Sequence, residues 1–288
     1  MIDRRAARRA SSRAAATYAG AAVLAHEVQV RMLERLQYIK IDPGRILDAG
    51  CGEGNGAARL AERYPGAQVL ALDFALPMIE AARRHDPWLR RVLKRARVEY
   101  LCADFDAVPL PAASVDLAWS NLALHCAGDP QPAMKELRRV LKVGGLLMFS
   151  CYGPDTLKEL KRAFAAGDAA AHVHDFIDMH DLGDMLSVCG YSAPVMDMEV
   201  ITLTYTGVDA LLADLRATGQ QNALAGRRRG LTGKGVLGAM RVAYESLRRD
   251  GRLPASFEIV YGHAWKPAQR FTDDGRAVIK FEPPRKRS

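Results

Sequence analysis

Residues 44–54 read Gly44-Arg45-Ile46-Leu47-Asp48-Ala49-Gly50-Cys51-Gly52-Glu53-Gly54. A short apolar run that ends in an acid and continues into three glycines at alternate positions predicts a buried strand, a tight turn and then a helix. The glycines let a ligand approach the backbone. The expected helix carries Ala57, Leu60, Ala61 and Tyr64 on one face. The turn therefore lies at a helix N-terminus whose amides face the ligand, and we expect a nucleotide-like molecule there.

The composition indicates a globular protein. The chain has 288 residues, of which 49% are hydrophobic, and this suits one large α/β domain with an appendage. No window approaches the roughly 18 uncharged apolar residues of a membrane-spanning helix. The five cysteines are odd in number and form no close pair, which argues against a disulfide framework or a zinc site. We therefore expect a reducing compartment, the cytoplasm.

The formal net charge is +8 at pH 7, with basic clusters between Arg4 and Arg13 and at 90–97, 227–229 and 285–287. Such a field attracts nucleic acid, an anionic protein or a charged metabolite, unless the charges only solvate the surface. The first 20 residues or so also have the composition of a mitochondrial transit peptide. We favour a mobile basic arm leading into a cover helix, because apolar residues from Tyr18 to Leu36 continue at helical spacing.

Two further strands are followed by acids. Residues 67–73 predict a strand that ends at Asp73. Its distance from Gly54 is close to the roughly 20 residues by which a Rossmann-like sheet places a carboxylate against a ribose. Phe74 and Met78, at the next helix, are positioned to flank an adenine. Residues 98–102 predict a third strand, and Asp104 follows it.

The remaining elements complete the predicted fold. Strands are expected at 115–120, 146–151, 194–205 and 257–265, and helices at 130–141, 155–164, 180–189, 208–217 and 236–248. Residues 142–145 are expected to stop the first of these helices with glycine in the left-handed region. The pattern indicates an α/β protein with a Rossmann-like, doubly wound, mostly parallel seven-stranded sheet and a helical cap insertion between the last two strands.

The chain is expected to divide into four parts. They are a basic arm and cover helix at 1–42, a ligand-binding core at 43–152, the rest of the sheet with the substrate cap at 153–266, and a disordered basic tail at 267–288.

These motifs resemble those of class I S-adenosylmethionine-dependent methyltransferases. The turn at 48–54, then Asp73, then 103–105 match that family's motif set, and the turn differs from the Gly-x-Gly-x-x-Gly of dehydrogenases. The resemblance implies that the glycines line the methionine end of S-adenosylmethionine, that Asp73 binds its ribose and that Asp104 with Phe105 meets its adenine. The expected cofactor-binding residues are Asp48, Gly50, Cys51, Gly52, Gly54, Asp73, Phe74, Met78, Asp104, Phe105, Asn121 and Leu122.

A closer resemblance covers residues 10–155. Residues 13–18, 115–123 and 137–141 are similar to the malonyl-acyl-carrier-protein O-methyltransferases of biotin synthesis. This implies methyl transfer to the free carboxylate of malonyl-acyl-carrier protein. The second half, from 153–160 to 261–265, also resembles a sister group, the mitochondrial complex I assembly factor that hydroxylates an arginine. The alternatives are therefore a protein arginine hydroxylase or assembly factor and a methyltransferase of a quinone-like small molecule.

A carboxylate acceptor is already ionised at neutral pH, so the reaction needs alignment and desolvation and no strong base. We expect a cation or hydrogen-bond donors in the site. The candidates for positioning the substrate are Tyr18 and His125, unless these residues are structural. Tyr18 matches a tyrosine of the family pattern, and His125 lies just past the fourth strand. Acyl carrier protein is acidic, so basic clusters would steer it, above all the arginines near the cap.

Other chemistries fit less well. Amino methylation of a base favours an Asn/Asp-Pro-Pro-Tyr turn after the fourth strand, where this chain has residues 120–123 as Ser-Asn-Leu-Ala, and the Pro-Cys of cytosine C5 methylation is absent. Nucleic acid and membrane are therefore not the expected partners. His172, His174 and His180 with nearby aspartates do not converge on the expected helix, so we expect no metal.

Overall fold

A seven-stranded sheet forms the centre of the protein, whose computed structural model describes residues 2–85 and 98–268. The strand order is β3-β2-β1-β4-β5-β7-β6. The strands are β1 Arg45–Ala49, β2 Gln68–Asp73, β3 Val98–Cys102, β4 Val115–Ser120, β5 Leu141–Tyr152, β6 Ser192–Tyr205 and β7 Leu253–Trp265. β1 to β5 are parallel, and β7 runs antiparallel to β5 and β6. The expected mostly parallel sheet is confirmed.

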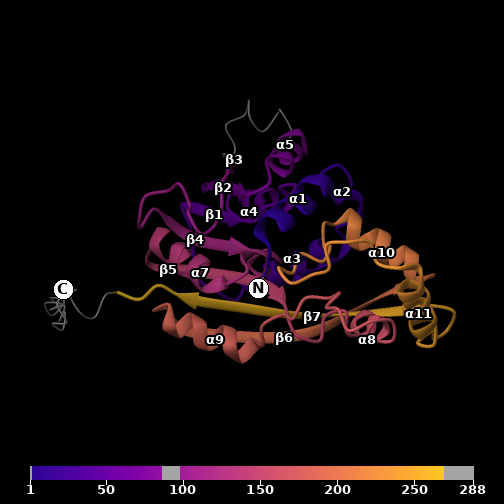
Figure 1. Ribbon diagram of the computed structural model, residues 1–288. Helices are drawn as coiled ribbons and strands as arrows, with labels where there is room; N and C mark the ends of the chain where they lie inside the picture. Colours follow the sequence, from indigo (N-terminus) through magenta and orange to yellow (C-terminus); the bar gives the residue numbers. More distant parts are fainter. Residues whose placement is uncertain (1, 86–97, 269–288) are drawn as a thin grey trace, which may run out of the picture.

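Helices cover both faces of this sheet (Figure 1). They are α1 Arg4–Ala14, α2 Tyr18–Ala21, α3 Val23–Leu36, α4 Asn55–Arg63, α5 Leu76–His85, α7 Pro130–Val140, α8 Lys158–Ala165, α9 Met179–Val188, α10 Val208–Ala217 and α11 Lys234–Glu245, with a short 3-10 helix at Leu124–Ala127. None of the helices in the described ranges is both long and apolar enough to cross a bilayer.

Alternate residues of each central strand pack on opposite faces. Ile46 of β1 lies in the apolar cluster that includes α3 and α4, whereas its neighbour Leu47 lies in the cluster that includes α7 and α9. Val69 and Leu70 of β2 divide in the same way. Both faces are buried, which explains why these strands read as continuous apolar runs in the sequence.

The strand order creates a crevice at one edge of the sheet. From β1 the chain moves outward to β2 and β3 and then returns to β4, on the other side of β1. From the carboxyl ends of β1 and β4 the chain therefore continues toward opposite edges of the sheet. Open α/β sheets bind ligands at such a point. The glycine turn of residues 50–54 follows β1 directly and lies there.

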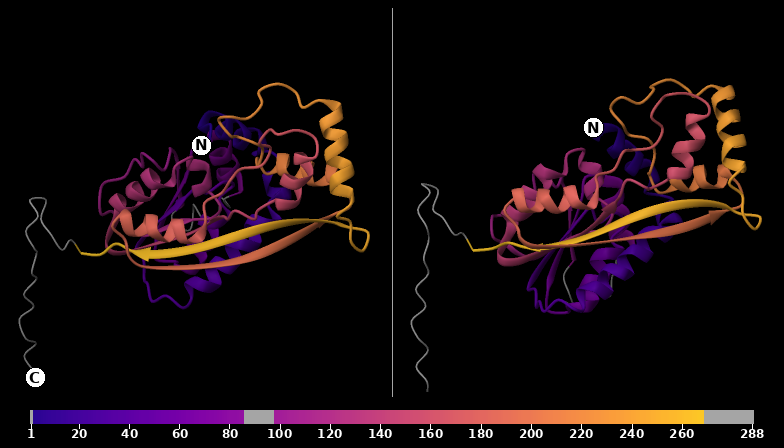
Figure 2. Two further views of the ribbon diagram at one scale, coloured as in Figure 1. Left: turned by 60° about the horizontal axis from the view of Figure 1, so that its bottom comes forward. Right: turned by 90° about the horizontal axis from the view of Figure 1, so that it is seen from below.

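Two long antiparallel strands carry the second half of the chain. α10 and α11 lie between β6 and β7 in sequence, and α8 packs against α11 and β7. Figure 2 shows these three helices gathered at one end of the β6–β7 ribbon. This assembly of α8, α10 and α11 is called the cap below.

Two expectations about local structure are wrong, one for the N-terminal arm and one for the end of α7. The residues expected as a mobile arm form α1, because Asp3 accepts a hydrogen bond from the Ala6 N–H as an N-cap, 3.0 Å away, and Ala7, Ala10 and Ala14 make a buried face. Residues 142–145 do not cap α7: the helix ends at Val140, and β5 begins at Leu141. The basic clusters at 90–97 and 285–287, and residues 269–288 of the expected tail, lie outside the described residues.

Packing of α3 on the sheet can be measured with two substitutions on that helix. Met32 is fully buried, whereas Val30 is 47% exposed. Met32→Ala is expected to lower the free energy of unfolding by about 2–5 kcal/mol, since it leaves a cavity in the core. Val30→Ala is the control and should change it by less than about 0.5 kcal/mol. Urea denaturation with equal losses for both variants would contradict the burial of this face.

Candidate active site

The three glycines after β1 have different roles. All have positive φ, at +85° for Gly50, +52° for Gly52 and +85° for Gly54. A Cβ atom on Gly50 would lie 2.2 Å from the Cβ atom of Ala123, so this glycine permits close packing of two loops. A Cβ atom on Gly52 would meet nothing nearer than the Tyr18 ring, at 3.7 Å. Gly52 is therefore the position at which the backbone of the turn is open to a ligand.

Asp73 connects this turn to the end of β2. One carboxylate oxygen accepts a hydrogen bond from the Gly52 N–H at 3.1 Å, and the other accepts one from the Ala75 N–H at 2.8 Å. The side chain is buried, and burial raises the pKa of Asp73 to about 6. Each oxygen keeps a further lone pair. Those lone pairs suit the two hydroxyl donors of a ribose, as the sequence predicts.

A cavity of about 80 Å³ lies above the turn and Asp73. Of the predicted site residues, it is lined by Tyr18, Gly50, Gly52, Asp73, Phe74, Met78, Phe105, Asn121, Leu122 and His125. An open glycine backbone, a buried carboxylate and flanking apolar side chains fit the methionine, ribose and adenine parts of S-adenosylmethionine. Pockets for such ligands usually measure roughly 300 Å³ or more. The cavity beside Asp73 is smaller than this, and it opens toward the larger cavity described below.

Four predicted cofactor residues do not line this cavity: Asp48, Cys51, Gly54 and Asp104. The Asp48 carboxylate lies beneath the first turn of α4, where a Cβ atom on Gly56 would come within 2.7 Å of its Oδ2 atom. Burial, and then the charge of Asp73, raise the pKa of Asp48 to about 7. Asp48 is thus placed to support the helix that begins after the turn.

The Asp104 carboxylate is bound by α1. It forms an ion pair with Arg4, and the Arg8 guanidinium lies 3.8 Å away. Arg4 also pairs with Asp106 at the same loop. Helix α1 is therefore tied to the loop that follows β3, on the side of the cavity where Phe105 lies.

Asn121 holds the cover helix to the sheet. Its side-chain N–H donates to the Ala25 carbonyl of α3 at 2.8 Å, and its oxygen accepts from the Ser150 hydroxyl at 2.8 Å. Both polar atoms of the amide are thereby engaged. Asn121 thus lines the cavity through a side chain that positions α3.

Tyr18 lies over Gly52 at the start of α2. Burial, together with the charges of Glu53 and Asp73, raises the pKa of the Tyr18 phenol above its usual value. The group therefore stays protonated at neutral pH, and its O–H can donate a hydrogen bond to an anion beside the turn.

His125 lies in an aromatic cluster. Its ring centroid is 4.7 Å from that of Tyr152 and 5.8 Å from that of Phe176. Burial lowers the pKa of His125 to about 3, and neither ring nitrogen makes a hydrogen bond of normal geometry to another described residue. The imidazole is therefore neutral, so of the two expected contributions, a cation or a hydrogen-bond donor, it can supply only a hydrogen bond.

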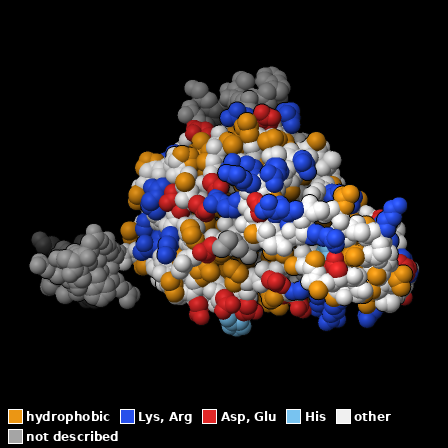
Figure 3. Space-filling model, in the orientation of Figure 1, with side chains coloured by type: hydrophobic (Ala, Val, Ile, Leu, Met, Phe, Trp, Pro, Cys, Tyr) orange, Lys and Arg blue, Asp and Glu red, His pale blue; other side chains and the backbone are white. Residues whose placement is uncertain are grey.

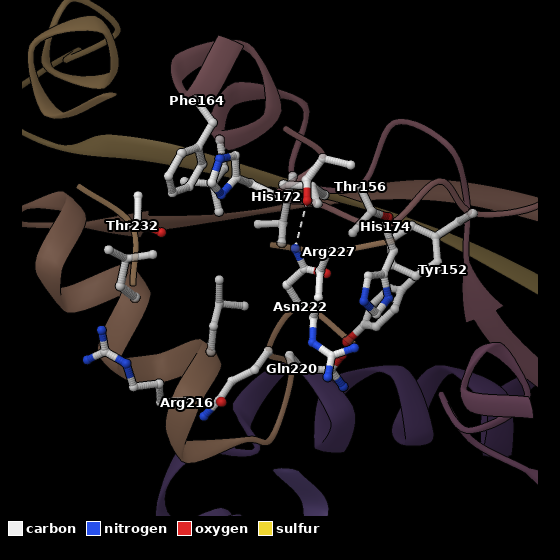
Figure 4. A pocket seen from close by; sticks show the side chains of 18 of the residues that line it. Tyr152, Thr156, Phe164, His172, His174, Arg216, Gln220, Asn222, Arg227 and Thr232 are labelled. Atoms are coloured by element: carbon white, nitrogen blue, oxygen red, sulfur yellow. Dashed lines mark hydrogen bonds between the residues drawn. The ribbon is translucent and has the colours of Figure 1, made fainter. Parts of the chain in front are cut away.

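A second, larger cavity of about 430 Å³ adjoins the first. It lies between the cap and residues 171–176, and it shares His174, Gln220 and Gln221 with the smaller cavity. Figure 4 shows Arg216, Gln220, Asn222 and Arg227 around this cavity, and all four line it. The apolar part of the cavity wall is formed by Leu157, Leu160, Phe164, Leu212, Leu215 and Phe257.

Two hydrogen bonds hold the segment between α10 and α11 in place over both cavities. The Asn222 side chain donates to the Ala171 carbonyl at 2.8 Å, and the Ala223 N–H donates to Nε2 of His174 at 2.8 Å. Because Nε2 of His174 accepts, the neutral ring carries its proton on Nδ1. His174 therefore acts here as a structural acceptor.

The histidines considered for a metal have separate partners. His172 contacts Asp168 at 2.7 Å and His180 contacts Asp178 at 2.9 Å. Within residues 2–85 and 98–268, no group of three or more His, Cys, Asp or Glu side chains converges as metal ligands would.

Sequence reasoning missed the amides that separate the two cavities. Gln220, Gln221 and Asn222 form a run of three amides inside a stretch otherwise rich in Gly and Arg. That run was an available signal, because amides at a turn between helices are suited to binding. Ala7 and Ser11, which lie four residues apart on α1, also line the smaller cavity. They were missed because α1 was expected to be mobile.

The role of Asp73 can be tested with Asp73→Asn, which keeps the shape of the side chain and removes its charge. We expect affinity for S-adenosylmethionine to fall by about tenfold or more, because hydrogen bonds to a charged acceptor contribute about 1.5–3 kcal/mol. Asp116→Asn is the matched control, because Asp116 also accepts from two backbone N–H groups, those of Gly44 and Arg45, at the opposite edge of the sheet. Calorimetry showing unchanged affinity for Asp73→Asn would refute the ribose assignment.

The raised pKa of Asp73 also predicts a pH dependence. Ribose donors favour the carboxylate, so binding is full above about pH 6 and weakens as the pH falls through about 6, where Asp73 takes up a proton. In Asp73→Asn this change should be lost. If the variant kept the wild-type profile from about pH 7 to about pH 5, another group would be responsible.

Known proteins are similar to this chain over its whole length. Residues 47–149 match the family of methyltransferase domains. A malonyl-acyl-carrier-protein O-methyltransferase of Gallionella capsiferriformans is 52% identical over 280 residues, which cover 97% of each chain. One of Laribacter hongkongensis is 51% identical over 287 residues, which cover 98% of this chain and 96% of that protein.

A solved structure gives the same fold. The YcgJ protein of Bacillus subtilis aligns with a TM-score of 0.59 at 17% identity and covers 85% of this chain and 100% of its own. At that identity the likeness shows the fold alone. The full-length relatives at about half identity carry the family assignment, and the chain belongs to the malonyl-acyl-carrier-protein O-methyltransferase family.

Proposed function

We propose that this protein transfers the methyl group of S-adenosylmethionine to the free carboxylate of malonyl-acyl-carrier protein, as a step of cytoplasmic biotin synthesis. The observation that carries the proposal is the pair of adjoining cavities. One has the glycine turn and Asp73, the other has room for a thioester arm, and Gln220 lies in the wall of both. The relatives that share this sequence over its length bear the name of that reaction.

The larger cavity suits a malonyl thioester better than a quinone. Its volume of about 430 Å³ lies in the usual range for small-molecule sites, roughly 300–1,000 Å³. Apolar side chains line one part of it, and Arg216, Gln220, Asn222 and Arg227 line another. Asn222 and Arg227 already have partners in Ala171 and Asp3, but a long hydrophobic ring substituent would offer Arg216 and Gln220 no hydrogen-bond partners. A pantetheine arm, which alternates methylene and amide groups, provides them.

The residues between the cavities can orient a carboxylate without transferring a proton. When bound, S-adenosylmethionine supplies an electrophilic methyl group on a sulfonium. Tyr18 donates from the side of the glycine turn, and Gln220 donates from the side of the cap. His125, Tyr152 and Phe176 pack together beside them and exclude water. Alignment and desolvation are the contributions that an already ionised nucleophile requires.

The proposed reaction has a direct test. Purified protein incubated with S-adenosylmethionine and malonyl-acyl-carrier protein should give the methyl ester, which intact-protein mass spectrometry detects as a gain of one methyl group. Acetyl-carrier protein is the control, since it has no free carboxylate. A mass gain on the acetyl form, or none on the malonyl form, would contradict the proposal.

The positioning role of Tyr18 predicts a selective kinetic effect. Tyr18→Phe should lower kcat/KM for the malonyl substrate by about ten- to a hundredfold, the range expected when one hydrogen bond to a charged group is lost. Affinity for S-adenosylmethionine should remain. Tyr38→Phe removes the same hydroxyl from a residue that is 84% exposed and should have no effect. Full activity of Tyr18→Phe would show that this tyrosine only packs against the turn.

A further inference from the structure

A groove lined almost entirely by arginine lies beside the larger cavity. Helix α1 contributes Arg5 and Arg9, and the segment between α10 and α11 contributes Arg227, Arg228 and Arg229. Asp3 supplies the one carboxylate in the lining, and the groove encloses about 570 Å³. We call these five arginines with Asp3 the arginine groove. Figure 3 shows Lys and Arg side chains gathered across the middle of one face of the protein, over α1.

Most of this positive charge is not neutralised within the described residues. Arg227 is bound to Asp3 through two nitrogens, each 3.1 Å from the same oxygen, and Arg228 lies 3.9 Å from Asp168. Arg5, Arg9 and Arg229 are exposed and form no ion pair with a carboxylate in the described ranges. Several guanidinium groups that face one concave surface focus the electrostatic potential there and attract an anion.

The arginine groove opens where a substrate arm would enter. Arg227 and Arg228 line both the groove and the larger cavity. A partner seated in the groove is therefore next to the mouth of that cavity. The two features together fit an acidic protein that carries its substrate on a long prosthetic arm.

We propose that the arginine groove is the docking surface for the carrier protein, with Arg5, Arg9 and Arg229 contacting its acidic side chains while the arm enters the cavity past Arg227 and Arg228. This inference rests on the proposed function. Guanidinium groups suit it, since they bind carboxylates and phosphate esters through paired hydrogen bonds. A nucleic-acid surface fits less well, because the groove is lined by arginine and aspartate alone and offers bases no aromatic ring for stacking.

Charge reversal tests the docking surface. Arg5→Glu with Arg9→Glu, and separately Arg229→Glu, change the groove but not the lining of the larger cavity. We expect kcat/KM for malonyl-carrier protein to fall by about tenfold or more, and the deficit to shrink at high salt. With malonyl-pantetheine, which has no protein to dock, the same variants should match the wild type. Equal losses on both substrates, or no loss on either, would overturn the proposal.

A matched control reverses the same number of charges elsewhere. Lys40→Glu with Arg63→Glu alters two exposed cations near the starts of β1 and β2, at the opposite edge of the sheet. This variant should keep wild-type kinetics with both substrates. A loss on carrier protein as large as that of the groove variants would show that net charge, and not the groove, determines docking.

A binding measurement with carrier protein tests the docking surface independently of the proposed reaction. Fluorescence anisotropy with labelled carrier protein should show binding to the wild type and a loss of about tenfold or more with the groove variants, at about 0.15 M salt. This result is independent of catalysis, so it can stand even if no methyl ester forms. Unchanged binding by the groove variants would refute the docking surface. So would a labelled short oligonucleotide that binds the wild type more tightly than carrier protein does and loses that affinity in these variants, since it would identify the groove as a nucleic-acid surface.

Discussion

The carboxylate of Asp73 accepts hydrogen bonds from the backbone N–H groups of Gly52 and Ala75, and it thereby joins the turn after β1 to the end of β2. The turn is held at a second point, where the N–H groups of Gly50 and Cys51 both donate to the Leu72 carbonyl, at 2.7 and 2.9 Å. These bonds fix the glycine backbone at the crevice of the sheet. Removing the Asp73 carboxylate from water costs free energy, and the raised pKa of Asp73 is a consequence of that burial. Ribose hydroxyl donors would offset that cost.

The smaller cavity is covered by α1 and the segment between α10 and α11, and that segment also forms part of the wall of the larger cavity. The Asp3 N–H donates to the Ala223 carbonyl at 2.7 Å, the Asp3 carboxylate binds Arg227, and Ile2 pairs with Leu224 as an isolated β-bridge. At its other side α1 is bound to the loop after β3 through Arg4. Through Asp3 and Arg227, the N-terminal end of α1 is therefore connected to the wall of the acceptor cavity. The segment between α10 and α11 thus borders both the donor cavity and the acceptor cavity.

Local sequence patterns were sufficient to predict the core. β3 and β4 begin and end where the alternation of apolar residues placed them, and the acids Asp73 and Asp104 follow their strands as expected. The failures occurred where a distant contact decides the structure. Helix α1 is held in place because Ala14 packs with Ala75 and Met78 and because Arg4 reaches Asp104, about a hundred residues away. Spacing within residues 1–20 shows neither contact.

The acceptor side was harder to predict for the same reason. Gln220 meets the cavity beside Asp73 only after the chain has formed six strands of the sheet and placed α10 between β6 and β7 in sequence. His125 was a candidate for positioning the substrate because it follows the fourth strand, and only the folded structure shows that Tyr152 and Phe176, from other segments, pack on it and bury it. Tertiary packing determines the surroundings of such residues. A single sequence gives their chemistry but not their neighbours.

The central claim is that a carboxylate lies between the glycine turn and the cap, in line with the methyl donor. A crystal structure of the protein with S-adenosylhomocysteine and a non-hydrolysable malonyl-pantetheine measures this directly. We expect the ribose hydroxyls on the Asp73 carboxylate, the arm in the cavity lined by Arg216 and Arg227, and the malonyl carboxylate within hydrogen-bond distance of Tyr18 or Gln220. A malonyl group bound with its carboxylate in the arginine groove, away from the sulfur of S-adenosylhomocysteine, would contradict it.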